Sequence, residues 1–190
     1  MTTPIWTPDV HRRSTSQVEE FRITVGVEGG YRDLHRWSVD HPGDFWRAAW
    51  DHLGVMGDPG DRPIQSVGDH PTGTRFFPDG YLNFAENLLA HADDSPALVF
   101  RGEDGSRREL SRQDLHNLVS RLQQALLDLG VEPGDRVAAW LPNVAETYAV
   151  MLASASIGAV FSSTSPDFGT DGVLDRFGQI EPVVLFATDG

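Results

Sequence analysis

The clearest pattern of apolar and polar positions lies between residues 134 and 168. It predicts a short apolar strand at 136–141, a helix from about 144 to 157, and a second strand at 159–162. The helix is apolar nearly all round, which indicates burial on several sides. A buried helix between two short strands is typical of a parallel sheet whose two faces are covered.

The ends of this helix also carry sequence signals. Asn143 is expected to cap its first turn, with Glu146 three positions later, close to a capping box. Gly158 stands where a left-handed residue is expected to end the helix.

The pattern before residue 97 predicts helices rather than a sheet. Residues 1–13 are expected to be extended, and residues 54–81, which are rich in Gly, Pro and Asp, are expected to form a linker or long loop. An aromatic stripe at helical spacing around Trp37–Trp50 indicates packing rather than ligand stacking. The helices are predicted at 14–27, 31–39, 44–53 and 82–92, the last with Phe84, Leu88 and Leu89 facing inward.

From residue 97 the pattern predicts a hairpin of strands 97–101 and 107–110, a helix at 111–129 capped by Ser111, and, after the central stretch, a helix at 170–180 and a strand at 183–187. We expect an α/β protein: a helical N-terminal region, then the first part of a mainly parallel, helix-covered sheet. The expected divisions are an arm and helix at 1–30, a helical region at 31–95, and an incomplete α/β domain at 96–190. The residues expected to face inward on the two long helices are Leu115, Leu118, Leu122, Leu126, Leu129, Val173, Leu174, Phe177 and Ile180.

The polar loop 163–169 follows a buried strand, at the edge of a parallel sheet where ligands gather. Two interpretations fit it. Asp167 or Thr170 caps the next helix while the hydroxyls bind the loop backbone, or the loop borders a nucleotide or thioester-carrier site.

Composition removes several classes of function. The formal net charge of −13 argues against a nucleic-acid partner, because binding nucleic acid requires a cationic surface. The absence of cysteine excludes thiolate chemistry, and no apolar run reaches the length of a membrane span. All 15 basic residues are arginine, so Schiff-base chemistry and lysine-dependent phosphate loops are excluded. We expect a cytoplasmic setting and no membrane partner.

No dinucleotide fingerprint, P-loop, nucleophile elbow or metal-ligand spacing is present. The sequence therefore predicts no catalytic residue and no metal ligand within this chain.

Three stretches resemble acetoacetyl-CoA synthetases, members of the acyl-adenylate-forming superfamily. They are FFPDGYLNFAENLL (76–89), GVEPGDRVAAWLPNVAETYAVMLASASIGAVFSSTSPDFG (130–169) and VLDRFGQIEPVVLF (173–186). The segment at 34–51 resembles the N-terminal segment of the acetyl- and acetoacetyl-CoA synthetase group. The resemblance implies that 96–190 is the first part of an AMP-binding domain and that the chain is the N-terminal portion of an acid–CoA ligase.

The resemblance implies the substrates and cofactors ATP, CoA and Mg²⁺, and the reaction of acetoacetate, ATP and CoA to acetoacetyl-CoA, AMP and pyrophosphate through an acyl-adenylate. By position it also implies a CoA-side loop at Ser165, Pro166 and Asp167, although the glycine pair of related enzymes is absent there. The family's phosphate loop, ribose-binding aspartate and adenylation lysine match no residue here.

A buried strand at 183–187 normally needs further neighbours, so we expect the sequence to be the front portion of a larger protein. We expect the 190-residue chain to be inactive alone, because the family's catalytic residues match no position in it. Its expected partners are small-molecule substrates, the rest of the enzyme chain and another copy of itself. Three alternatives remain: a ligase for acetate or propionate, a non-catalytic binding or assembly module, and a nicotinamide-dependent enzyme, which the missing fingerprint disfavours.

Overall fold

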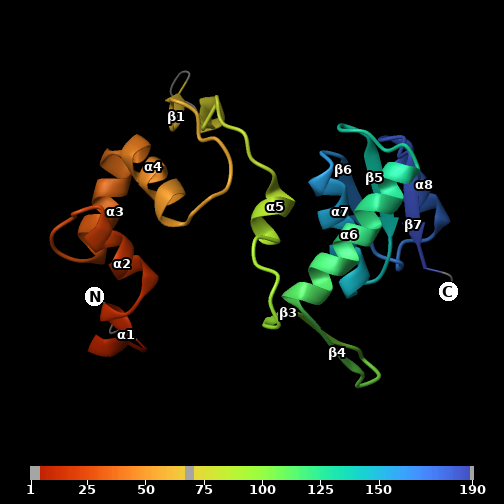
Figure 1. Ribbon diagram of the computed structural model, residues 1–190, viewed down its shortest axis with the longest axis horizontal. Coiled ribbons are helices and arrows are strands. Elements are labelled where there is room, and N and C mark those ends of the chain that lie inside the picture. Colours follow the sequence, from red (N-terminus) through yellow and green to blue (C-terminus); the bar gives the residue numbers. More distant parts are fainter. Residues whose placement is uncertain (1–4, 67–70, 189–190) are drawn as a thin grey trace. The chain divides into compact units, whose positions relative to one another are not determined.

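Met1–Leu82 and Asn83–Gly190 form two separate units. The computed structural model describes residues 5–66 and 71–188 (Figure 1). The predicted fold class, helices followed by a parallel helix-covered sheet, is confirmed.

The N-terminal unit consists mainly of helices that pack through aromatic side chains. Phe21 is buried and its ring meets Phe45 edge-on, with ring centroids 5.8 Å apart. Trp50 is also buried, and the centroids of its ring and the ring of Phe77 are 4.8 Å apart. Aromatic residues of the stripe therefore pack as predicted, although Trp46 stays 40% exposed. The helices are α1 (Val10–Ser14), α2 (Gln17–Thr24), α3 (Tyr31–Asp40) and α4 (Pro42–His52).

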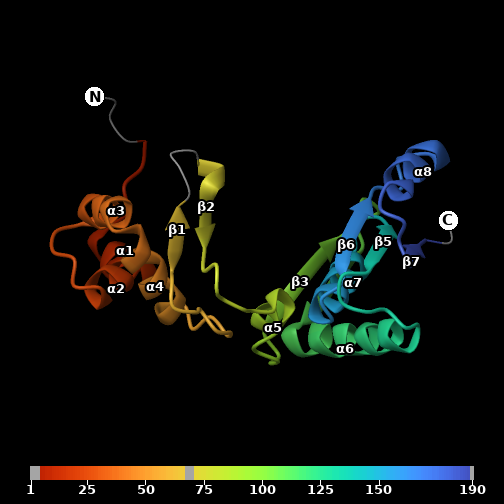
Figure 2. The same cartoon turned by 90° about the horizontal axis from the view of Figure 1, so that it is seen from above.

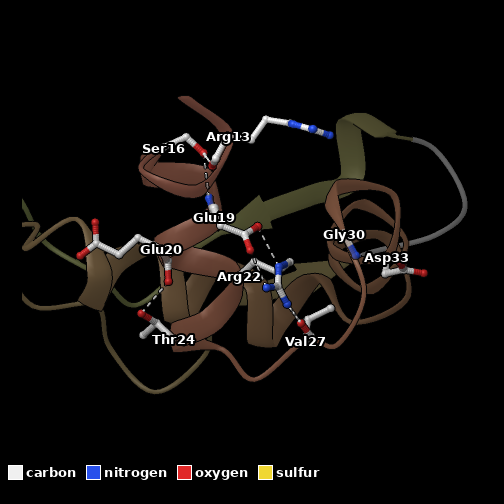
Figure 3. A network of polar contacts seen from close by, with 9 residues as sticks. All are labelled: Arg13, Ser16, Glu19, Glu20, Arg22, Thr24, Val27, Gly30 and Asp33. Carbon is white, nitrogen blue, oxygen red and sulfur yellow. Dashed lines mark hydrogen bonds and ion pairs between the residues drawn. The ribbon is translucent and has the colours of Figure 1, made fainter. Parts of the chain in front are cut away.

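The first predicted helix and the extended arm before it are wrong in detail. The side chain of Asp9 accepts a hydrogen bond from the backbone N–H of Arg12 at 2.8 Å, which starts α1 inside the segment expected to be extended. Ser16 then caps a new helix, because its Oγ accepts from the N–H of Glu19 at 3.3 Å (Figure 3). Two local caps thus divide one predicted helix into two.

A polar network holds the end of α2. The Arg22 guanidinium donates to both carboxylate oxygens of Glu19, at 2.9 and 2.6 Å, and also to the carbonyl oxygen of Val27 (Figure 3). The hydrogen bond from Arg22 lowers the pKa of Glu19. The N–H of Gly30 donates to Asp33 at 2.9 Å, which closes the first turn of α3.

The predicted linker contains a small antiparallel pair that the sequence did not reveal. Strand β1 (Ile64–Ser66) pairs with β2 (Thr74–Phe76), and a short 3₁₀ turn, η1 (Pro71–Gly73), precedes β2. Three-residue strands are too short for an alternating pattern to emerge.

The C-terminal unit is built on a parallel sheet with the strand order β6-β5-β7. Val137 packs in the cluster formed with α6 and α7, whereas the next residue, Ala138, packs against Val173 and Phe177 of α8. Because successive side chains point to opposite faces, helices cover both faces of β5 (Figure 2). The elements are α5 (Phe84–Leu88), β3 (Pro96–Arg101), β4 (Arg107–Ser111), α6 (Arg112–Asp128), β5 (Arg136–Trp140), α7 (Ala145–Ser156), β6 (Val160–Thr164), α8 (Thr170–Gly178) and β7 (Val184–Ala187).

Some predicted core positions are corrected. Leu129 and Leu174 are 68% and 65% exposed; Val119, outside the predicted stripe, is buried instead. On α5 the large apolar residues Phe84 and Leu88 are exposed rather than facing inward, and the fully buried residue is Ala85. The Ser111 cap of α6 is confirmed, because its Oγ accepts from the N–H of Asp114 at 3.1 Å.

Within residues 5–66 and 71–188, no helix is both long and apolar enough to cross a bilayer.

Candidate functional site

Three strands end together at the carboxyl edge of the sheet. Trp140 of β5 is in register with Thr164 of β6 and with Ala187 of β7. Ligands of open parallel sheets bind beyond this edge, where the loops leave the strands. The sequence predicts a loop at 163–169, but Ser163 and Thr164 are the last residues of β6. The loop that leaves β6 is therefore residues 165–169, and it leads directly into α8.

The loop is a turn that its own side chains organise. Ser165 and Pro166 are half-buried and Asp167 is exposed. The hydroxyl of Ser165 donates to Oδ2 of Asp167 at 2.9 Å and accepts from the N–H of Asp167 at 3.3 Å. The structure therefore brings Ser165 and Asp167 together. The Ser165 hydroxyl binds the loop backbone, as the first of the two interpretations of this loop predicts.

The same loop corrects the predicted start of the next helix. Gly169 is the N-cap of α8, with no side-chain hydrogen bond to the cap. Asp167 points its carboxylate toward Ser165 instead, so neither Asp167 nor Thr170 caps the helix. Arg176, in the last turn of α8, has its guanidinium carbon 3.9 Å from the ring centroid of Phe168 and thus connects the helix back to the loop.

Trp140 is the residue at this edge that the sequence did not single out, whereas Thr164, expected in the polar loop 163–169, is the last residue of β6. Neighbouring residues in register on parallel strands share a face, so both lie on the α8 face with Ala138. Thr164 is 8% exposed. The indole nitrogen of Trp140 is buried, and it has no hydrogen-bond partner within the described residues. The sequence does contain a signal that could have drawn attention to Trp140: it is the only tryptophan after residue 50, and it is the last residue of a buried strand.

A charged pair marks the start of α7, which follows β5 at the same edge. Arg108 of β4 donates to Glu146, and this hydrogen bond lowers the pKa of Glu146. The predicted capping box is wrong for that reason: the N-cap is Val144, with no side-chain cap, and the side chain of Glu146 points toward the hairpin. The predicted Gly158 end of α7 is confirmed by its φ of 76°.

These residues suit some ligand groups and not others. The buried indole N–H is an uncharged donor in apolar surroundings, which suits a carbonyl oxygen rather than a phosphate. The segment 164–169 carries no basic side chain. In the part of the chain that the structure describes, no three His, Asp or Glu side chains are grouped to hold a metal ion.

Two family descriptions match the sequence. "AMP-binding enzyme" matches residues 84–190, and "Acetyl-coenzyme A synthetase N-terminus" matches residues 31–88.

Similar proteins are CoA synthetases of much greater length. The chain is 48% identical over 192 residues to an acetoacetyl-coenzyme A synthetase of Rhizobium meliloti, covering 98% of this chain and 29% of that one. A malonamoyl-CoA synthetase of Penicillium aethiopicum is 39% identical over 166 residues, which cover 82% of this chain and 22% of that protein. The solved acetoacetyl-CoA synthetase from Streptomyces lividans superposes with a TM-score of 0.88 at 38% identity. The match covers 100% of this chain and 30% of that chain. The chain thus spans less than a third of the length of these relatives.

Proposed function

We propose, from the premise that this chain belongs to the AMP-binding enzyme family, that it is the N-terminal part of an ATP-dependent acetoacetate–CoA ligase. The observation that carries the proposal is the match along nearly the whole chain to acetoacetyl-coenzyme A synthetase at 48% identity. The parallel sheet with a ligand-side loop at its carboxyl edge supports it.

The proposed reaction has two steps. A carboxylate oxygen of acetoacetate attacks the α-phosphorus of ATP, and pyrophosphate leaves with the electrons of the broken P–O bond. The thiolate of CoA then attacks the acyl carbon, and AMP leaves, which gives acetoacetyl-CoA. Mg²⁺ bound to the phosphates neutralises their charge in such transfers. We assign no catalytic residue to this chain.

Within this reaction, the loop of Ser165, Pro166 and Asp167 is proposed to border the path of CoA. The support is its place directly after β6 and the pinned geometry that the Ser165–Asp167 hydrogen bonds create. A preorganised turn lowers the entropy lost when a ligand is bound.

The test is acetoacetate-dependent exchange of labelled pyrophosphate into ATP. We expect the complete protein to catalyse exchange, and the 190-residue chain to catalyse none. A rate with acetoacetate no greater than the rate without any acid would overturn the proposal for the complete protein. Exchange by the 190-residue chain alone would refute the statement that this chain is inactive.

For the acid substrate, one specific alternative to acetoacetate has support. The malonamoyl-CoA synthetase among the similar proteins acts on a different short acid by its name, so a changed acid pocket is compatible with this N-terminal region. Comparing kcat/KM for acetoacetate, malonamate, acetate and propionate on the complete protein decides between them.

We further propose that the complete enzyme works in the cytoplasm, because the reaction draws on internal pools of ATP and CoA. Its partners would be these small molecules and the chain that follows residue 190. Self-association is also proposed, and sedimentation of the complete protein tests it.

A further inference from the structure

We draw no further inference here: the strongest candidate, the mainly apolar cavity of about 370 Å³ between α2, α3 and α4 in the N-terminal unit, with Phe21 and Leu34 buried in its lining and Val18, Tyr31 and Leu53 exposed, carries nothing because the structure does not show what covers or fills it.

Discussion

The side-chain amide of Asn83 donates to the main-chain carbonyl oxygen of Ala155 at 3.1 Å, across 72 positions of sequence. The same amide reaches the carbonyl oxygen of Ser156 at 3.2 Å. Its oxygen accepts from the N–H of Glu86 at 3.1 Å and so caps α5. One half-buried side chain thus begins a short helix and binds two carbonyl oxygens at the end of α7, where that of Ala155 also accepts from the N–H of Gly158 at 3.1 Å.

Asn83→Ala should destabilise the C-terminal unit by about 2–3 kcal/mol, because a helix cap and two hydrogen bonds to helix-end carbonyls are lost together. Asn83→Ser is the matched control: its hydroxyl can still cap α5 but cannot reach both carbonyls, so we expect roughly half that loss. Urea unfolding followed by circular dichroism measures both. Equal stability of the Ser variant and the unmutated chain would show that the bonds to α7 contribute nothing.

Gly158→Ala should cost about 1–2 kcal/mol of folding free energy, because Gly158 has a φ of 76° that other residues adopt only with strain. An added Cβ would also lie 3.2 Å from Cβ of Pro133. Gly178 ends α8 with open space around it, so Gly178→Ala should be neutral or stabilise the chain by up to about 1 kcal/mol. Thermal unfolding of both variants checks this, and a similar loss in each would contradict it.

Acid should weaken the contact between Arg108 and Glu146. The hydrogen bond from Arg108 lowers the pKa of Glu146 in the folded chain, so its stabilisation is present above the unfolded pKa, about 4.3. It is lost as the pH falls through the lower folded pKa. Because the Glu146 side chain is 46% exposed, we expect a difference within about 1 kcal/mol at pH 7 between the unmutated chain and Glu146→Gln.

Urea titrations at pH 7, 4 and 3 measure this dependence. The unmutated chain should lose more stability on acidification than Glu146→Gln, and added salt should shrink the difference. Glu103→Gln, a charge removal in the turn of the same hairpin, is the control and should titrate like the unmutated chain. Parallel pH curves for the Glu146→Gln and unmutated chains would rule the effect out.

The sequence predicted the parts of the fold that local rules determine. The strand–helix–strand unit, the Ser111 cap and the end of α7 at Gly158 all rest on neighbouring residues, and they were predicted correctly. The start of α7 was not, because Glu146 binds Arg108 from a hairpin 38 positions away instead of the backbone beside it. Long-range polar pairs of this kind leave no periodic signal.

The candidate site, too, combines a feature that local sequence predicted with features that depend on long-range contacts. The rule for carboxyl ends of parallel strands pointed to the loop 163–169 from sequence alone. The choice of Ser165, Pro166 and Asp167 within it came from the family resemblance and stays a prediction. The alignment of Trp140 with Thr164 required the register of β5 against β6, which the apolar run of each strand does not specify. That the indole N–H of Trp140 has no hydrogen-bond partner among the described residues could be recognised only once its surroundings were known.

Arg136 provides the last prediction, because it holds the turn that leads into β7. Its Nε donates to the carbonyl oxygen of Ile180 at 2.8 Å and its Nη2 to that of Glu181 at 2.9 Å. Glu181 has a φ of 47°, which is unfavourable for a residue with a side chain, so the turn depends on such contacts.

Arg136→Ala should lower the free energy of unfolding by about 2 kcal/mol, since two hydrogen bonds from a charged donor are lost at a strained turn. Arg136→Lys should recover little, because an ammonium cannot present the planar fork that reaches two carbonyls at once. Arg176→Ala is the comparison: Arg176 donates to Gly172 at 3.1 Å and lies over the ring of Phe168, and neither of these contacts involves the turn before β7. Because Arg176 is exposed, its loss should cost under about 1 kcal/mol. Hydrogen exchange of the β7 amides should quicken in the Arg136 variants and stay unchanged in the Arg176 variant. If Lys at position 136 restores full protection, the charge rather than the forked geometry holds β7 against β5.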